Sequence, residues 1–469
     1  MPDLLIKNAQ LPNHKNLVNI SINGAYIESI DDISEKTEYD DAPKAIYDAK
    51  GYFVCAGFYE SHIHLDKACI LDRCTIEQGD LNEAVEETGK AKKDFTEIDV
   101  FNRASRVIEM AIKKGTVGLR TFVETDSKTE MRAFNAIKKA RDTYAFAIDI
   151  EICAFAQSGL TNDLHTHELL KLALSQGADL VGGCPYKDEN PHKHIEMVFD
   201  LAEQFDVDVD FHLDFDLDPQ GSSIPKLVEE TIKRHYQGRV SIGHVTKLSA
   251  MDKDKRMEMA ALLKFADITL TVLPATDIFL NGRDYDALIP RGMVNANELL
   301  AMGINTTISS NNILNAFTPY GDASLIRMAN MYANITQLAK DEQIAEVFDM
   351  ISKNAAKLLS RQTEIKVGAP ATLVILEAKD AVEAIRINSQ AIAGFKNGKQ
   401  TFCNEVAHIC FEYHYLSTFS QLKDTAYQCA SIFIIKHRSK TIKASPNYTL
   451  DDAFHNGFFT IYYSFNIMV

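Results

Sequence analysis

The sequence predicts an α/β protein built around a barrel of eight parallel strands. Between residues 57 and 360, eight short and nearly continuous apolar runs alternate with stretches of helical periodicity. Strands that are buried on both faces have such unbroken apolar runs, and repeated strand–helix units indicate a parallel sheet. Eight units that close on themselves form a TIM (β/α)8 barrel, which needs roughly 250 residues. The chain of 469 residues has room for this barrel and for an accessory domain.

A small β-sandwich accessory domain is predicted from the two ends of the barrel segment. Residues 1–56 alternate apolar and polar side chains in short runs, and Asn23-Gly24 is a typical hairpin turn. Residues 365–376 return to strand character, so we expect residues 361–403 to join the N-terminal sheet. Residues 404–469 are rich in phenylalanine and tyrosine but lack a clear periodicity, and the sequence predicts neither a structure nor a role for this tail.

The barrel itself is expected to occupy residues 57–360. Its first strand ends at His62 and His64, and the apolar runs that predict the other seven strands follow in order along the chain. These runs are residues 116–122, 147–154, 179–182, 207–212, 240–244, 268–273 and 304–309. Helical periodicity is clearest over residues 81–93, 100–114 and 341–360.

Histidines end several of the predicted strands, on the side where barrel enzymes have their active sites. His62 and His64 are two apart on a strand and therefore point the same way, while strands five and six end at His212 and His244. A single strand-end histidine is more often a core or loop residue, but this convergence favours a metal site. Neutral imidazoles suit Zn²⁺ or Fe²⁺, with a position left for a water whose pKa falls to about 7.

Two further His-x-His pairs are not predicted to bind a metal. His165 and His167, like His192 and His194, precede helix-like stretches, and residues i and i+2 do not share a face of a helix.

The composition excludes several classes of partner. A formal net charge of -16 disfavours nucleic acid, which is bound mainly through clustered lysine and arginine. No window has the 18 or so apolar residues that a membrane span requires. The N-terminus lacks the pattern of a signal peptide, and none of the eight cysteines forms a Cys-x-x-Cys pair, so we expect reduced cysteines and a cytoplasmic protein. A small, neutral or weakly polar molecule fits better as a partner, and the alternative is that the acidic surface only keeps the protein soluble.

Ordered motifs across residues 1–403 resemble those of metal-dependent amidohydrolases, within them the branch of cytosine deaminase and N-isopropylammelide aminohydrolase. The motifs are Gly-Phe-Tyr-Glu-Ser-His-Ile-His-Leu-Asp-Lys at 57–67, Ala-Phe-Ala-Gln-Ser-Gly at 154–159, Phe-His-Leu-Asp at 211–214, Gly-His-Val-Thr at 243–246, Leu-Asn-Gly-Arg at 280–283 and Thr-Pro-Tyr-Gly-Asp at 318–322. The resemblance implies a hydrolase of this fold with one divalent metal, Zn or Fe, and a heterocyclic substrate, and it is compatible with homo-oligomers.

Carried over position by position, the resemblance also implies roles for single residues. His62, His64 and His212 would hold the metal, and His244 would move a proton of the water beside it. Gln157 would bind the amide face of a pyrimidine or triazine ring, since a side-chain amide both donates and accepts; a plain loop amide is the alternative. Lys67 would polarise a ring atom or steady the leaving group; an ordinary solvated lysine is the alternative.

Two departures from the family pattern leave the activity open. Asn311 stands where the family has an aspartate that binds metal and accepts a proton; its carbonyl oxygen can be a ligand, but it cannot accept a proton at neutral pH. Phe215 stands where the cytosine deaminase branch has a proton-shuttling glutamate. Asp214, two residues beyond His212 on the same strand face, could replace it, as could Asp216 if the strand extends that far.

Two hypotheses follow. The first is a metal-dependent hydrolase that removes an amino or alkylamino group from a small nitrogen heterocycle, or opens a related cyclic amide. The second is a catalytically impaired relative that binds a ligand, because Asn311 and Phe215 replace two expected carboxylates. Lys187 follows the fourth strand, where a carboxylated lysine would bridge a second metal, but its position after Pro185-Tyr186 favours an exposed lysine.

Overall fold

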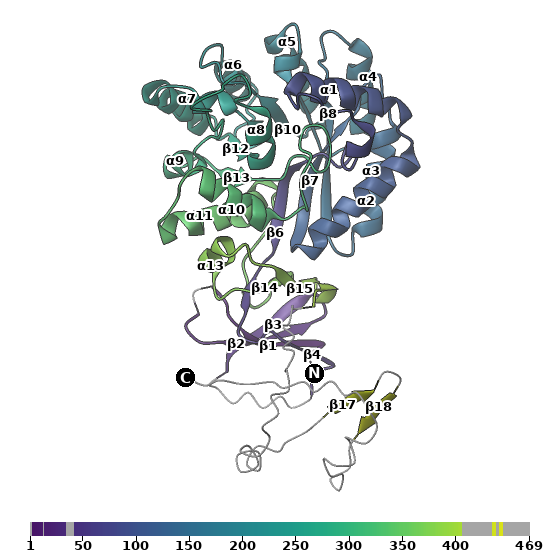
Figure 1. Ribbon diagram of the computed structural model, residues 1–469, viewed down its shortest axis with the longest axis vertical. Coiled ribbons are helices and arrows are strands. Elements are labelled where there is room, and N and C mark those ends of the chain that lie inside the picture. The colour runs from purple at the N-terminus through teal and green to yellow at the C-terminus, as the bar shows by residue number, and fades with distance from the viewer. Residues whose placement is uncertain (1, 13, 34–41, 406–433, 438–439, 444–469) are drawn as a thin grey trace, which may run out of the picture. The chain divides into compact units, whose positions relative to one another are not determined.

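Eight parallel strands form the central sheet in the computed structural model, which describes residues 2–12, 14–33, 42–405, 434–437 and 440–443 (Figure 1). They pair in chain order: β6 (Phe58–Ile63), β7 (Thr116–Glu124), β8 (Asp149–Ala156), β9 (Leu180–Gly183), β10 (Asp208–Leu213), β11 (Val240–His244), β12 (Thr269–Val272) and β13 (Thr306–Ile308). A parallel bridge between Ile63 and Asn311 joins the segment after β13 to β6. The predicted eight-stranded barrel is confirmed.

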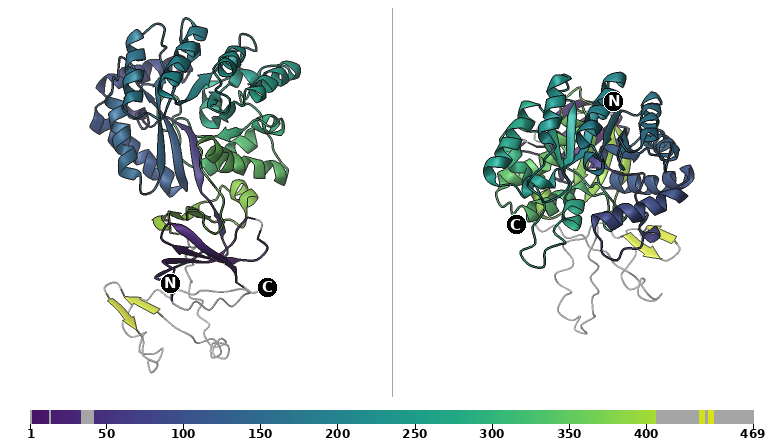
Figure 2. Two further views of the ribbon diagram at one scale, coloured as in Figure 1. Left: turned by 180° about the vertical axis from the view of Figure 1, so that it is seen from behind. Right: turned by 90° about the horizontal axis from the view of Figure 1, so that it is seen from above.

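Helices follow the barrel strands and lie around them when the molecule is seen from above (Figure 2). They are α1 (Leu81–Ala91) and α2 (Glu97–Lys113) after β6, α3 (Arg132–Tyr144), α4 (Leu164–Ser175), α5 (Pro191–Phe205), α6 (Ile224–Lys233), α7 (Lys253–Phe265), α8 (Pro274–Leu280), α9 (Ala296–Ala301), and α10 (Leu325–Ile335), α11 (Asp341–Ile351) and α12 (Lys353–Leu358) after β13. Several begin at a side-chain cap, such as Asp80 for α1 and Thr96 for α2, which accepts a backbone N–H of the first turn.

Two four-stranded sheets make up the accessory part of the fold. One has the order β3 (Tyr26–Asp32), β2 (Val18–Asn23), β1 (Leu4–Ala9), β4 (Ala45–Asp48); the other has the order β16 (Lys399–Cys403), β15 (Ala391–Lys396), β14 (Leu373–Leu376), β5 (Phe53–Cys55). Helix α13 (Ala381–Arg386) connects β14 and β15. Ile6 and Ile20 of the first sheet share a buried core with Ile375 and Phe395 of the second, so segments from both ends of the chain form one sandwich, as predicted.

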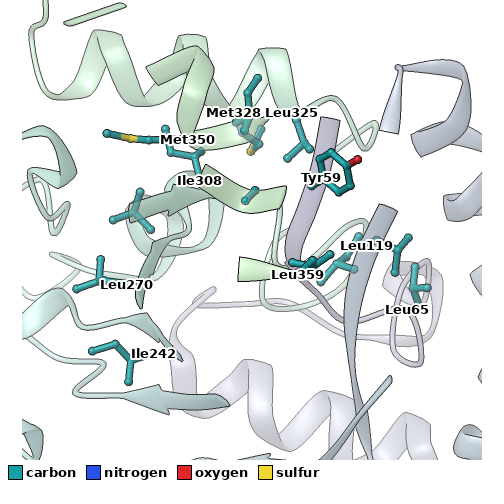
Figure 3. Close-up of a cluster of buried hydrophobic side chains, with 14 of the residues drawn as sticks. Tyr59, Leu65, Leu119, Ile242, Leu270, Ile308, Leu325, Met328, Met350 and Leu359 are labelled. Carbon is teal, nitrogen blue, oxygen red and sulfur yellow. The ribbon is translucent and has the colours of Figure 1, made fainter. Parts of the chain in front are cut away.

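Apolar side chains of strands and helices form a second, larger core around the barrel (Figure 3). Leu119, Ile242 and Ile308 from the strands are buried, as are Met328 of α10 and Met350 of α11. At the close contact of β9 with β10, a Cβ on Gly182 would lie 1.9 Å from the Asp210 carbonyl oxygen, so only glycine fits there.

One turn, the domain boundaries and the C-terminal tail are the other predicted features of the fold. The hairpin at Asn23-Gly24 is present between β2 and β3. The domain boundaries at residues 56, 360 and 403 stay predictions. The predicted tail of residues 404–469 lies almost entirely outside the described residues; within it, β17 (Ile434–His437) pairs with β18 (Lys440–Lys443). In the part of the chain that is described, no helix has the length and apolar character to cross a membrane.

Candidate active site

Four histidines from three barrel strands meet at the carboxyl ends of those strands. The Nε2 atoms of His62 and His212 lie 3.1 Å apart, and those of His64 and His212 lie 2.9 Å apart. The ring of His244 lies 5.1 Å from that of His212, measured between centroids. His62 ends up opposite His212 because β6 is one end of the sheet, and closure of the barrel brings it across the interior from β10. The structure therefore brings together all four predicted histidines.

Burial favours the neutral form of three of these imidazoles. His62, His64 and His212 are almost completely buried, and desolvation lowers the pKa of each well below its ordinary value, with the neighbouring histidines acting in the same direction. Neutral imidazole is the form that binds a metal.

The donor set of this cluster fits one divalent cation. His212 Nε2 faces two other ring nitrogens, while the Nδ1 atoms of His62, His64 and His212 have no hydrogen-bond partner among the described residues. One proton cannot satisfy His212 Nε2 and both of the ring nitrogens that face it. A cation placed among the three Nε2 atoms would instead bind the lone pair of each. The trio whose ligand atoms all lie within 4.8 Å of one another is His62, His212 and His244, so His244 competes with His64 as a third ligand.

Asp277 fixes the orientation of His244. The Nδ1 atom of His244 donates to Asp277 Oδ1 at 2.6 Å, and Asp277 Oδ2 accepts the backbone N–H of Leu273 at 3.1 Å. Burial raises the pKa of Asp277, and the adjacent His244 opposes this shift. In the neutral tautomer that carries its proton on Nδ1, the Nε2 atom of His244 presents a lone pair that can accept a hydrogen bond.

Asn311 lies beside that lone pair. Its Nδ2 atom donates to His244 Nε2 at 3.3 Å, and its Oδ1 atom is buried without a hydrogen-bond partner among the described residues. Backbone bonds hold it in place, since Asn311 N donates to His62 O and His64 N donates to Asn311 O. The structure thus brings the predicted Asn311 to the histidine cluster, with an oxygen that can act as a ligand and an amide that cannot accept a proton.

Lys67 and Gln157 contact each other, and both line the cavity beside the cluster. The Nζ atom of Lys67 donates to Gln157 Oε1 at 3.0 Å and to Glu124 Oε1 at 2.6 Å. Burial lowers the pKa of Lys67 to about 8, although nearby carboxylates oppose the shift. Lys67 is 1% exposed, which excludes the alternative of a solvated lysine.

A small cavity opens next to these groups. Its polar lining includes His64, Lys67, Gln157, His212, His244, Asn311 and Asn312, and its apolar lining includes Leu81, Tyr186, Phe215, Leu280 and Phe317. Phe215 lies edge-on to His244 at 4.6 Å between ring centroids. Among the described residues that line the cavity, none is a carboxylate.

Asp214 does not join the cluster. Strand β10 ends at Leu213, and Asp214 has a φ of 49°, so the alternation that would place it beside His212 stops before it. Its carboxylate accepts from the Ser222 hydroxyl at 2.6 Å and from Ser223 N at 3.1 Å. Asp216 likewise pairs with Lys247 at 2.7 Å. Both acids hold loop structure in this geometry.

Lys187 and the histidines of the two other His-x-His pairs lie outside the cavity lining. Lys187 is partly exposed, and His165 and His192 are exposed. His194 is buried, but its Nδ1 atom is paired with Asp188 at 3.0 Å.

Three contributors to the site were missed from the sequence: Asp277, Glu124 and Phe317. Glu124 is the last residue of β7, so collecting polar strand ends on strand two would have found it. Asp277 lies in α8, directly after β12, and the same rule with a few residues of tolerance would have included it. Phe317, whose ring lies 4.5 Å from Lys67 Nζ, follows a loop and has no signal in the sequence.

Comparisons with known proteins find similar sequences. Residues 121–402 match the sequence model of the Amidohydrolase family. The chain is 28% identical over 419 residues to N-isopropylammelide isopropyl amidohydrolase of Pseudomonas sp. (strain ADP), covering 86% of this chain and 98% of that protein. It is 23% identical over 338 residues to pterin deaminase of Rhizobium rhizogenes, covering 71% of this chain and 76% of the relative.

A solved structure has the same architecture. 5-Methylcytosine deaminase from Klebsiella pneumoniae, liganded with 5-fluorocytosine, superposes with a TM-score of 0.81 at 27% identity. The match covers 87% of this chain and 99% of the deaminase chain.

Proposed function

Because the chain belongs to the amidohydrolase family, in its cytosine deaminase and N-isopropylammelide aminohydrolase branch, we propose that it removes an amino or alkylamino group from a small nitrogen heterocycle. The substrate class is a pyrimidine or triazine ring, or a related cyclic amide. The observation that carries the proposal is the convergence of four histidines beside one cavity. His64, His212 and His244 line this cavity together with Lys67 and Gln157, and His62 lies behind them against His212.

A divalent metal, Zn or Fe, is part of the proposal. His62, His64 and His212 would hold it, with the unpartnered Asn311 Oδ1 as a further oxygen donor. When bound, such a cation lowers the pKa of a water to about 7 and so supplies the nucleophile at neutral pH.

His244 is the proposed proton carrier. Its Nε2 lone pair accepts a proton as water adds to the ring carbon that bears the nitrogen, and the same atom returns that proton to the departing amine. Asp277, at 2.6 Å from Nδ1, stabilises the transient imidazolium and holds the ring in the tautomer that can accept. Asn311 Nδ2 must release Nε2 for this to occur, because one lone pair cannot accept from both groups.

Lys67 and Gln157 orient the ring. The ammonium has three N–H groups, of which Glu124 and Gln157 take two, so one remains for a ring oxygen or nitrogen. Phe215 and Phe317 supply apolar walls against which a flat ring can pack.

We also propose that the protein acts in the cytoplasm on a small molecule, with no nucleic-acid or membrane partner, and forms homo-oligomers. Support for the compartment is that the six cysteines in the described ranges (Cys55, Cys69, Cys74, Cys153, Cys184 and Cys403) are free.

A second candidate function is ligand binding without turnover. Asn311 favours it, because its amide donates to the very nitrogen that must accept a proton and cannot accept one itself.

Metal content and amine release test the proposal together. The purified, dialysed protein is expected to contain about one Zn or Fe per chain by plasma mass spectrometry, and to release ammonia or an alkylamine from at least one aminopyrimidine or aminotriazine. His212→Ala should lose both properties, whereas His192→Ala, which changes an exposed histidine, should lose neither. A parent protein without bound metal would overturn the proposed function.

The Asn311→Asp variant distinguishes the two candidates. If the protein is an enzyme that has lost turnover through Asn311, the restored carboxylate should raise amine release by about 10²-fold, the lower end of the range for a positioned proton-transfer group. If Asn311 is adapted to its own substrate, the change should lower activity or leave it unaltered.

A further inference from the structure

A chain of buried charges lies behind the cavity wall at Lys67. Lys67 Nζ binds Glu124 Oε1 at 2.6 Å, Glu124 Oε2 is paired with Lys92 Nζ, and Lys92 Nζ lies 3.1 Å from Asp126 Oδ2. These four side chains are each at most 4% exposed. Only Lys67 lines the cavity; the other three lie beyond it.

The carboxylates and Lys92 of this row of ion pairs lie in different elements of the barrel. Glu124 ends β7, and Asp126 follows it in a turn, where its Oδ1 atom accepts the backbone N–H groups of Lys128 and Thr129 at 3.0 Å each. Lys92 stands at the end of α1, in the connection that joins β6 to β7. The ammonium of Lys92 is thereby anchored to a rigid turn on one side and reaches Glu124 on the other.

Glu124 has no freedom to rotate within this arrangement. Each of its carboxylate oxygens faces one ammonium, so turning the group would break an ion pair in a dry environment. The position of Lys67 Nζ follows from this, since its other contacts are Gln157 Oε1 at 3.0 Å and the Phe317 ring at 4.5 Å.

Stability alone does not account for Lys92. Buried ion pairs are often replaced by apolar residues of similar volume without loss of stability, because desolvation offsets the attraction between the charges. Lys92 is connected to the cavity-lining Lys67 by two successive ion pairs through Glu124. Its effect on the position of Lys67 is therefore the better explanation for a lysine buried there.

We propose that Lys92 is a positioning residue that acts through Glu124 to hold the Lys67 ammonium where it donates to the heterocycle. The inference rests on the proposed function for the identity of the substrate. The effect of Lys92 on the position of Lys67 does not depend on that function. Lys92 does not contact the substrate; Lys67 does.

A double-mutant cycle tests the proposal. With the aminopyrimidine or aminotriazine that the parent protein turns over, Lys92→Met is expected to lower kcat/KM by about 10²-fold, the cost of a small misplacement of a binding group. Lys67→Met should lose at least as much, and Lys92→Met combined with Lys67→Met should lose no more than Lys67→Met alone. Lys93→Met, which changes the exposed neighbouring lysine, is the matched control and should retain parent activity. Losses that multiply in the double variant would overturn the proposal.

Crystal structures supply a readout that needs no substrate. In metal-loaded Lys92→Met, the Glu124 carboxylate should turn and the Lys67 Nζ–Gln157 Oε1 contact should open, whereas Lys92→Arg should keep it. An unchanged contact in Lys92→Met would refute the inference. If Lys92→Met does not fold, Lys92→Gln serves for both measurements. If the parent protein turns over none of the ring compounds, the proposed function fails, and the crystal structures still decide the role of Lys92.

Discussion

Replacing Asp277 with asparagine should invert the tautomer of His244 while leaving its position unchanged. Asp277 Oδ2 accepts the backbone N–H of Leu273 at 3.1 Å, so an asparagine must keep its carbonyl oxygen at that place. Its amide NH₂ then faces His244 Nδ1, which has to become the acceptor. The proton moves to Nε2, the nitrogen that the proposed mechanism uses as a base.

The expected loss is large because one atom changes its role. We expect kcat to fall roughly 10²- to 10⁴-fold, the contribution of a positioned proton-transfer group, which corresponds to about 3 to 5 kcal/mol of activation free energy. KM should change little, since Asp277 does not line the cavity. Amine release measures the rate, and nitrogen NMR of the imidazole reports the tautomer.

Two results would refute this reasoning. A variant with kcat close to that of the parent would show that the tautomer of His244 does not matter. Loss of the metal together with activity would show that His244 is a ligand, as its place in the compact histidine trio allows. Asp284→Asn changes an exposed aspartate shortly after helix α8, which carries Asp277. This variant is the control and should behave like the parent.

Three other predictions concern the pH profile, the core and the strand contacts. Because the pKa of Lys67 is lowered to about 8, its ammonium is present below that pH and lost above it. The value of kcat/KM should therefore fall as the pH rises through about 8. The same fall in the pH profile of Lys67→Met would contradict this assignment. Phe395→Ala empties part of the sandwich core and should lower the free energy of unfolding by about 3 to 5 kcal/mol in urea titrations, with kcat unchanged. Gly182→Ala forces a Cβ against the Asp210 carbonyl oxygen and should abolish soluble expression or lower Tm strongly, whereas an unchanged Tm would show that the two strands can separate at no cost.

The sequence determined the barrel and the identity of the histidines, because both depend on local patterns. Apolar runs and helical periodicity report which segments are buried strands and which are helices, and those patterns do not require knowledge of distant contacts. His62 and His64 share a face of their strand by its two-residue repeat alone. The rule that barrel sites lie at the carboxyl ends of strands adds His212 and His244 from the sequence alone.

The tertiary structure alone decided which neighbours these residues have. Asp214 was expected on the strand face of His212, but a positive φ just after the strand sends its carboxylate to Ser222 instead. Backbone angles at a strand end depend on the loop that follows, and no periodic pattern continues into that loop. The sequence leaves Lys67 as either solvated or functional, and in the fold it is buried against Glu124 at the end of the next strand. Glu124 in turn pairs with Lys92, which lies 25 residues further along the same connection as Lys67. Whether a charge is exposed or buried depends on chain segments far away in the sequence, and only folding brings them together.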